Sequence, residues 1–403
     1  MYRPTLWRQA LGLGLLMTLV VFALSACGEE RGGGGGQEAN KNSASGGGQE
    51  ANKNSASGGG GAANGQIVFR RWLDPDQTKG ALFTMNPDGS HIRQVTHPPE
   101  GWRDDNPEWS PDGTKVAFHR QRIDERMSRI MVVNPDTGDV RQVTHCGPDR
   151  GWTKEHPPPS SGHYCDADFL PAWTPDGDSV TFRRILCPCD ESSIVEGIWM
   201  VGLDGSDLHQ LTNVDPKLPE AFSDWGSDFS PDGKMLVFDR QQRKKAPKLV
   251  KVGEEEPYYH AVFVQSLDSP GEPEDAHQIT PWKLNCQDRP EFSPDGDLVL
   301  FRCLPEGEEG PSNLYWVHSD GTGLHPLTDE DADTQYLGSS FSSSFRKGEG
   351  WITVGRTAGY GEEGNADVFR LLIKDGEIVS SVNLTKSTIW DSNPSWGTHP
   401  PVG

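Results

Sequence analysis

Basic residues are scarce in this sequence relative to acidic ones. The 403 residues include 37 lysines and arginines against 59 aspartates and glutamates, which gives a formal net charge of −22 at pH 7. A surface with this excess of negative charge repels phosphate groups. Nucleic acid and anionic lipid are therefore excluded as principal binding partners, and an acidic surface that keeps the protein soluble is the simplest interpretation.

The sequence also lacks an apolar run of the roughly 20 residues that a membrane-spanning helix needs. Its longest apolar segment, residues 10–23, follows Arg3 and Arg8 and precedes Leu24-Ser25-Ala26-Cys27. This order of a basic region, an apolar core and small residues is typical of a secretory signal. The last four residues resemble a bacterial lipobox, which implies a signal peptide at 1–26 and lipid attachment to Cys27. An uncleaved membrane anchor is the alternative.

The composition changes twice after the signal. Residues 32–61 are rich in glycine, and the segment 34–45 is repeated at 46–57. Such a stretch cannot bury enough apolar surface to fold, so residues 27–65 are expected to form a flexible tether, and its roughly 30 glycine-rich residues have an r.m.s. span on the order of 30 Å. Residues 66–403 are long enough for one large β domain.

A five-residue turn recurs four times in this domain. Each copy has an aromatic residue, then Ser or Thr, then Pro-Asp-Gly, and an alternating apolar segment follows it. Proline presets φ near −65°, aspartate bonds its own backbone, and glycine takes the positive φ that tightens a hairpin. The copies lie at residues 109–113, 173–177, 229–233 and 292–296.

An apolar residue followed by threonine ends each repeat unit and occurs six times. The threonines are Thr96, Thr144, Thr212, Thr280, Thr328 and Thr385, and the units span 67–96, 104–144, 168–212, 224–280, 288–328 and 337–385. The first unit has no strand with a Trp-Ser-Pro-Asp-Gly turn before its other strands, whereas residues 391–397 copy the 104–110 segment that begins the second unit. The sequence therefore predicts an all-β, six-bladed β-propeller of four-stranded blades, closed by a C-terminal strand that joins the first blade.

The repeat unit is similar to the WD40-like repeat of TolB-type propellers. The similarity rests on the Asn-Pro-x-Trp-Ser-Pro-Asp-Gly pattern at 106–113, the alternating strand after it, a later Asp-Gly turn and the closing threonine. The resemblance implies the fold but leaves the function open, because related propellers include partner-binding domains, gates on hydrolases and lyases. No Gly-x-Ser-x-Gly motif occurs, so we expect the chain not to be an enzyme.

The alternation of strand direction places the longer connections at one end of the ring. They lie at 146–167, 187–196, 241–260 and 357–365, and long loops on a rigid scaffold are frequent binding sites. The third of these ends at Tyr258 and Tyr259, and tyrosine is enriched in protein interfaces. We expect a binding loop there, with a solvated lobe as the alternative.

Six further cysteines map to the same end of the ring, and in an exported domain disulfides are favoured over free thiols. Cys286 and Cys303 flank the turn at Asp295 almost symmetrically. Cys165 and Cys187 flank Asp176 in the same way, which leaves Cys146 to pair with Cys189. The alternatives are Cys146–Cys165 with Cys187–Cys189, or a zinc site formed by His163, Cys165, Cys187 and Cys189.

Acidic residues suggest two further sites. An aspartate precedes the innermost strand of five units, at Asp104, Asp168, Asp224, Asp288 and Asp391. These side chains are expected to form a ring that binds a cation or a basic partner group, or alternatively to accept backbone hydrogen bonds from a neighbouring blade. Asp329, Asp331 and Asp333 resemble a calcium-ligand run without the glycine and glutamate of an EF-hand, so a structural calcium ion is possible there.

Two functional hypotheses follow. The first is a monomeric, lipid-anchored extracytoplasmic scaffold that binds an envelope protein, peptide or glycan through the loop-rich end and needs no cofactor. The alternative is a metal-assisted polysaccharide lyase or hydrolase at the channel mouth, resembling the oligogalacturonate lyase branch of propellers. That branch needs clustered histidines, and His156, His163 and His260 are the only histidines in the expected loops.

Overall fold

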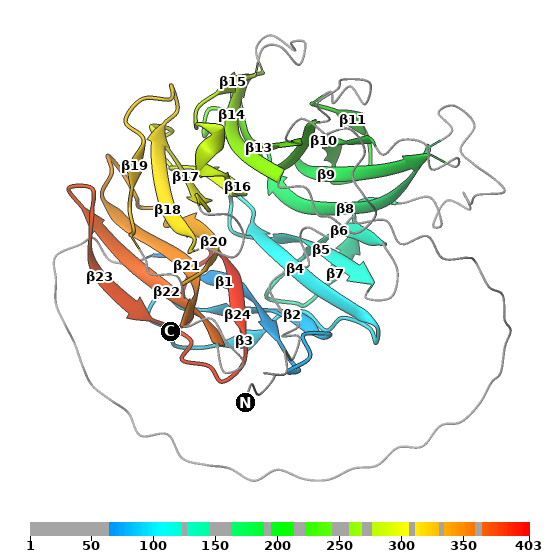
Figure 1. Cartoon of the computed structure of the whole chain (residues 1–403). Coiled ribbons are helices and arrows are strands. Elements are labelled where there is room, and N and C mark those ends of the chain that lie inside the picture. Colours follow the sequence, from blue (N-terminus) through cyan, green and yellow to red (C-terminus); the bar gives the residue numbers. More distant parts are fainter. Residues whose placement is uncertain are drawn as a thin grey trace, which may run out of the picture. The chain divides into compact units, whose positions relative to one another are not determined.

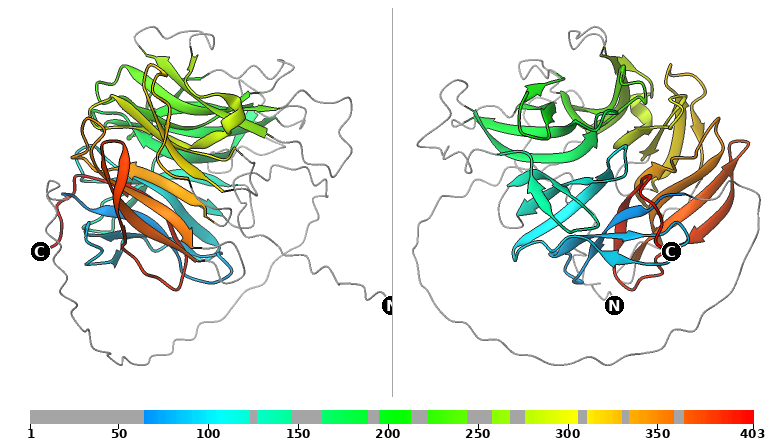
Figure 2. Two further views of the ribbon diagram at one scale, coloured as in Figure 1. Left: turned by 60° about the vertical axis from the view of Figure 1, so that its left-hand side comes forward. Right: turned by 180° about the vertical axis from the view of Figure 1, so that it is seen from behind.

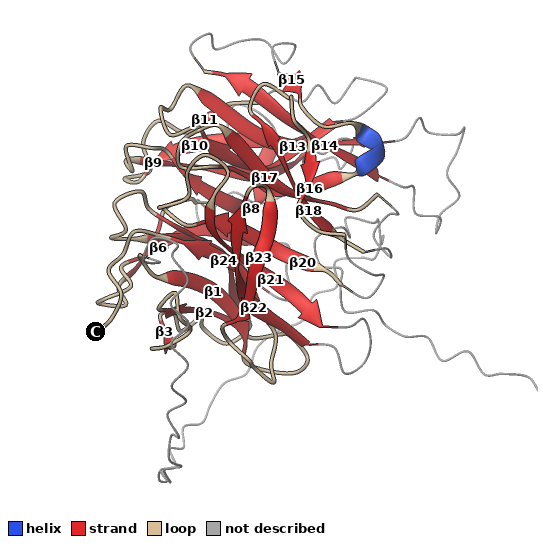
Figure 3. Cartoon of the chain, turned by 90° about the vertical axis from the view of Figure 1, so that its left-hand side faces the viewer, coloured by secondary structure: helices blue, strands red, loops and turns tan. Residues whose placement is uncertain are grey.

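The computed structural model describes residues 64–122, 127–145, 163–188, 195–212, 222–243, 258–267, 276–305, 311–329, 334–358 and 365–403. They belong to the compact unit Gly58–Gly403. Strands make up nearly all of the regular structure, and Figure 3 shows one short 3₁₀ helix, η3 (Trp282–Leu284), beside them. Within these ranges no helix is both long and apolar enough to cross a membrane.

The described strands pair into five antiparallel sheets, with one parallel contact (Figure 1). The first sheet has the order β24 (Asp391–Trp396), β1 (Ile67–Trp72), β2 (Gly80–Met85) and β3 (Arg93–Gln94). Three others follow the chain order. The second has β12 (Phe222–Phe229), β13 (Met235–Arg243), β14 (Tyr258–Ser266) and β15 (His277–Gln278), and the third has β16 (Cys286–Phe292), β17 (Leu298–Cys303), β18 (Asn313–His318) and β19 (His325–Pro326). The fourth has β20 (Tyr336–Phe341), β21 (Gly350–Ala358), β22 (Asn365–Lys374) and β23 (Glu377–Asn383).

The remaining sheet has eight strands in two halves of four. One half contains β4 (Trp102–Trp109), β5 (Val116–Arg122), β6 (Ser128–Val133) and β7 (Val140–Gln142), and the other contains β8 (His163–Trp173), β9 (Ser179–Pro188), β10 (Val195–Gly202) and β11 (His209–Gln210). A single parallel pair, Ser128 with Ala167, joins the halves. The predicted count of six blades agrees with these five sheets only when the two halves are counted separately, so the count itself stays a prediction.

The innermost strands contact one another in a closed cycle. The order is β24, β4, β8, β12, β16, β20 and back to β24, and the rotated views in Figure 2 show the sheets arranged radially around them. The closure follows from β24, which pairs with β1 and places Trp396 opposite Ile67. The prediction of an all-β propeller whose C-terminal strand completes the first blade is confirmed.

The predicted threonines perform the same role in every repeat unit. Each hydroxyl accepts a hydrogen bond from a backbone N–H of the third strand of its unit, at 2.8–3.0 Å. The outer strand is short, so this buried N–H of the third strand would otherwise lack an acceptor. This bond occurs six times, once in each four-stranded sheet and once in each half of the eight-stranded sheet.

The Pro-Asp-Gly turns also have the predicted geometry. Gly113 has φ of 68°, and its counterparts Gly177, Gly233 and Gly296 have φ of 73–79°. Asp112 accepts hydrogen bonds from the Ser110 hydroxyl and the Thr114 backbone, which hold the pKa of Asp112 down at about 2. These aspartates are therefore turn-forming groups.

The hydrophobic core lies between neighbouring sheets. The second strand of five units contributes a fully buried phenylalanine: Phe69, Phe118, Phe182, Phe238 and Phe301. Each innermost strand ends in a buried aromatic residue such as Trp109 or Trp396. Burying one such side chain contributes about 2–3 kcal/mol. The repeated aromatic residues therefore define the packing distance between sheets.

Candidate functional site

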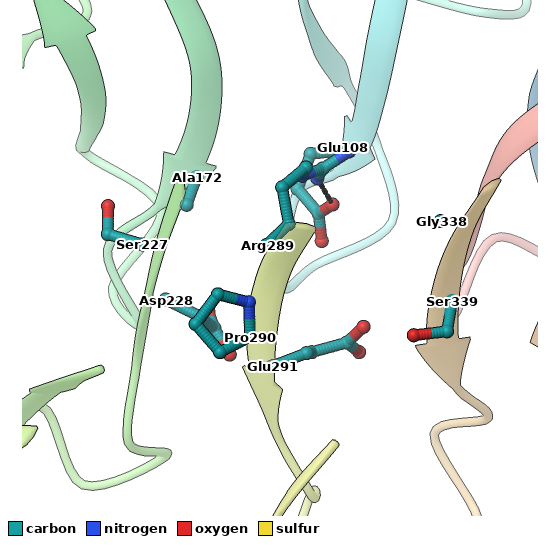
Figure 4. A pocket seen from close by; sticks show the side chains of 9 residues that line it. All are labelled: Glu108, Ala172, Ser227, Asp228, Arg289, Pro290, Glu291, Gly338 and Ser339. Carbon is teal, nitrogen blue, oxygen red and sulfur yellow. Dashed lines mark hydrogen bonds and ion pairs between the residues drawn. The ribbon is translucent and has the colours of Figure 1, made fainter. Parts of the chain in front are cut away.

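The innermost strands enclose a small cavity at the centre of the ring, shown in Figure 4. It has a volume of about 20 Å³, which is enough for about one water molecule. The lining comes from five innermost strands: Glu108 from β4, Ala172 from β8, Ser227 and Asp228 from β12, Arg289, Pro290 and Glu291 from β16, and Gly338 and Ser339 from β20. We call this space the central cavity.

A break in strand pairing directs these side chains inward. The register shifts in each innermost strand, for example between Asp105 and Glu108 in β4 and between Gln287 and Glu291 in β16. Arg289 has φ of 56° and Leu170, in β8, has φ of 55°. Positive φ is unfavourable for such residues and is held in place by surrounding structure. A bulge of this kind re-aims the side chains that follow it.

Gly226 shows why the bulge in β12 needs glycine. A Cβ atom at this position would lie 2.8–2.9 Å from the Cγ and Cα atoms of Arg289 in the adjacent innermost strand. The missing side chain lets Arg289 pass close to β12. The Arg289 guanidinium is thereby brought into the central cavity, as Figure 4 shows.

The central cavity contains three carboxyl groups and one guanidinium. Arg289 donates from Nη2 to the Oε2 atom of Glu108, and the Ser395 hydroxyl also bonds Glu108. Glu291 Oε1 accepts from the Ser340 hydroxyl and the Phe341 backbone N–H, both at 3.1 Å. Asp228 Oδ2 accepts from the Phe292 backbone N–H at 2.8 Å. Only one of the carboxyl groups is therefore paired with a cation.

Burial raises the pKa of all three carboxyl groups, and repulsion by neighbouring carboxylates adds to this for Asp228 and Glu291. Burial, followed by the charge of Glu108, raises the pKa of Asp228 to about 7. Burial and the charges of Glu108 and Asp228 raise the pKa of Glu291 well above its usual value. Burial also raises the pKa of Glu108, although Arg289 opposes this shift. Chemically, the cavity can hold protons or a single small molecule such as water.

The predicted aspartate ring has a different environment. Asp104, Asp168, Asp224 and Asp391 are fully buried. Each accepts two hydrogen bonds, at 2.6–3.0 Å, from one arginine on the second strand of its own unit: Arg120, Arg184, Arg240 and Arg71. The expected alternative, hydrogen bonding to the backbone of a neighbouring blade, stays a prediction.

These ion pairs connect the first two strands of a blade, and threonines of the preceding units also reach two of the aspartates. Burial raises the pKa of Asp104 and Asp391, while the paired arginine opposes the shift. Thr96 and Thr385, which end the preceding units, also hydrogen-bond Asp104 and Asp391. A ligand would have to displace an arginine from each buried carboxylate. The binding role assigned to this ring stays a prediction.

The fifth unit departs from this arrangement. Its second strand has Cys303 where the others have arginine, and Cys303 forms a disulfide with Cys286. This confirms the predicted pairing. In strand register Cys286 pairs with Cys303 as Asp104 pairs with Arg120, so the disulfide takes the place of the ion pair, and Asp288 is not the residue equivalent to Asp104. The side chain of Asp288 lies outside the described residues.

Several other predicted site residues cannot be located in the described part of the chain. Cys27 and the tether precede it, Cys146 and Cys189 fall in its gaps, and so do Asp331, Asp333 and His156. The backbone of β8 and β9 places Cys165 opposite Leu186 and Cys187 opposite Tyr164. The pairings Cys165–Cys187 and Cys146–Cys189 stay predictions, as does the calcium site. Among the described residues no group of His, Cys, Asp and Glu could hold a metal ion.

The predicted loops are shorter than expected because strands extend into them. β8 begins at His163, β13 ends at Arg243, and β14 already begins at Tyr258. Tyr259 is half-buried in β14. His260 is fully buried, and its Nδ1 lies 2.9 Å from Asp239 Oδ2. Tyr258, Tyr259 and His260 are therefore strand residues.

Sequence reasoning missed the central cavity, although the repeat contains a signal for it. Glu108, Asp228 and Glu291 each stand directly before the aromatic residue that ends an innermost strand. The corresponding positions in the other units are Ala172, Ser340 and Ser395. An acidic residue at a repeat position next to a buried aromatic could have marked the cavity, because strand alternation turns it away from the core.

Comparison with known proteins supports the fold alone. No protein-family model matches the chain, and no curated protein matches its sequence. TolB from Acinetobacter baumannii is similar in structure, with a TM-score of 0.53 and 16% sequence identity over 84% of this chain and 67% of that one. A chain of the nidogen/laminin complex has a TM-score of 0.50 and 8% identity, over 83% of this chain and 100% of that one. The chain therefore has a β-propeller fold similar to that of TolB.

Proposed function

We propose that this protein is a membrane-anchored extracytoplasmic lipoprotein whose propeller is a non-enzymatic scaffold. In this proposal the loop-rich end of the ring binds a protein, peptide or glycan of the cell envelope. The observation that carries it is the small size of the central cavity, about 20 Å³. Ligand pockets usually measure about 300–1,000 Å³, so a sugar ring or peptide fits better on the outside of the ring.

The organisation of the ring supports an external binding surface. Short turns close the strands at one end, whereas the connections 146–162, 189–194, 244–257 and 359–364 leave from the other end. A rigid scaffold with variable loops at one end is a common arrangement for recognition. The nidogen/laminin structure shows a chain with a comparable fold in a complex of proteins.

Shortening two connections tests the binding surface. A chain with 146–162 and 244–257 replaced by short linkers keeps all of β6, β8, β13 and β14. We expect it to fold but to lose at least about 90% of the envelope component that the intact protein captures, because a lost interface of about 1.4 kcal/mol reduces affinity tenfold. Quantitative affinity capture from an envelope extract measures this loss.

The matched control replaces residues 268–275, which connect β14 to β15 at the opposite end of the strands. This variant should retain full capture. Equal capture by all three proteins would show that the loop-rich end does not bind the component.

The membrane anchor is a separate prediction. A Cys27→Ser variant has no thiol for lipid attachment. Because the lipid on Cys27 is the proposed membrane anchor, the variant loses that anchor. We expect more than about 90% of the variant to leave the membrane fraction, and metabolic labelling with a fatty acid should be absent. Membrane association of Cys27→Ser equal to that of the wild type would favour an uncleaved anchor.

A further inference from the structure

The central cavity has more acidic than basic side chains among the residues that line it. Glu108, Asp228 and Glu291 come from β4, β12 and β16, and Arg289 is the cation among the lining residues. β8 contributes Ala172 and β20 contributes Gly338 and Ser339. With all carboxyl groups ionised, the cavity would carry a net charge of −2.

The neutral hydrogen-bond donors do not remove this excess. Glu108 is paired with Arg289, so Asp228 and Glu291 depend on backbone N–H groups and one hydroxyl. Asp228 also accepts from the Phe229 backbone. The cavity of about 20 Å³ admits about one water molecule, and Asp228 and Glu291 are half-buried. Carboxyl groups that share one site repel each other when all of them are ionised, so one of them binds a proton instead.

We propose that Asp228 and Glu291 form a proton-binding pair in the folded ring, which holds at least one proton at neutral pH and releases it when the ring unfolds or the cavity opens. The charge of Asp228 acts on Glu291, and carboxyl groups that repel each other titrate as a pair. The raised pKa values of both residues agree with this assignment. The centre of the propeller then responds to the pH of the compartment that contains it.

The sign of the pH effect follows from proton linkage. The pKa of Asp228 is about 7 in the folded ring and close to 3.8 when the chain is unfolded. The folded state therefore binds more protons between about pH 4 and pH 7, and its stability falls as pH rises. One proton changes the unfolding equilibrium constant about tenfold per pH unit.

A buried histidine has the opposite effect in the same window. Burial lowers the pKa of His119 to about 4, so the unfolded state binds a proton there and stability rises with pH. Asp105, whose pKa is lowered to about 2 by Arg70 and other cations against the effect of its burial, changes stability only below this window. The wild-type curve alone is therefore insufficient, and variants must be compared with it.

The test uses urea unfolding of the full chain at pH 4.5 and pH 8. Asp228→Asn and Glu291→Gln imitate the protonated groups, and the exposed Glu377→Gln is the control. The ratio of the wild-type unfolding constant to that of Asp228→Asn/Glu291→Gln should be at least about 100-fold larger at pH 8 than at pH 4.5. A ratio that is the same at both pH values would overturn the proposal.

A second measurement needs only folded wild-type protein. Infrared spectra at pH 7 should contain the carbonyl absorption of a protonated carboxyl group, and this band should disappear in Asp228→Asn/Glu291→Gln or, if that variant does not fold, on raising the pH of the wild type above 9. Absence of the band at pH 7 would overturn the proposal even if no variant folds.

Discussion

Deletion of residues 391–403 is expected to abolish cooperative folding of the ring. The deleted segment contains all of β24, whose six residues are buried. Its loss would leave one edge of β1 unpaired and remove Asp391, the partner of Arg71. It would also expose Ile67 and the other core residues that pack with Trp396. We expect a loss of stability of at least about 5 kcal/mol, which is comparable to the whole stability of many domains.

Urea unfolding followed by tryptophan fluorescence measures this effect. The truncated chain should show a broad, non-cooperative transition or none, and amide hydrogen exchange should be fast in β1 and β4. A sharp transition at the wild-type urea concentration would show that β24 does not close the ring.

A circular permutant provides the matched control. Gly397 donates its backbone N–H to the carbonyl of Gln66 at 3.0 Å, so the end of β24 lies beside the start of β1. A chain that begins with 391–397, continues through a short linker to 64 and ends at 390 restores the same β24–β1 hairpin. It should regain cooperative unfolding, because the contacts return while the chain order changes.

Replacement of Arg240 by methionine is expected to destabilise the protein by about 3–5 kcal/mol. Arg240 Nε and Nη2 donate to the fully buried Asp224 at 2.6 and 3.0 Å. Methionine keeps a flexible apolar stem near Phe238 and Phe263, over whose rings the guanidinium lies. The large effect comes from the uncompensated charge left on Asp224, and the urea midpoint measures it.

The double variant Asp224→Leu/Arg240→Met separates charge from packing. It should recover most of the lost stability, because removing both partners of a buried ion pair is often nearly neutral. Lys234→Met, an exposed change in the turn before β13, should leave the midpoint unchanged. If the double variant were as unstable as Arg240→Met, the pair would act through packing and not through charge.

The sequence by itself determined the repeat and the closure of the ring. The Pro-Asp-Gly turns and the six threonines act locally, since each aspartate, glycine and threonine bonds the backbone of its own unit. Local interactions of this kind recur wherever the same residues recur. The copy of 104–110 at 391–397 likewise identified β24, and the symmetric spacing around Asp295 identified Cys286–Cys303.

Only the tertiary structure decided what the acidic residues contact. The partner of Asp224 is Arg240, and this pairing depends on a bulge between Asp224 and Ser227 that sets the register. A shift of one residue reverses the face of every side chain, and the sequence pattern does not reveal where a bulge falls. The central cavity depends even more on assembly, because Glu108, Asp228 and Glu291 come from three innermost strands that meet only when the ring closes.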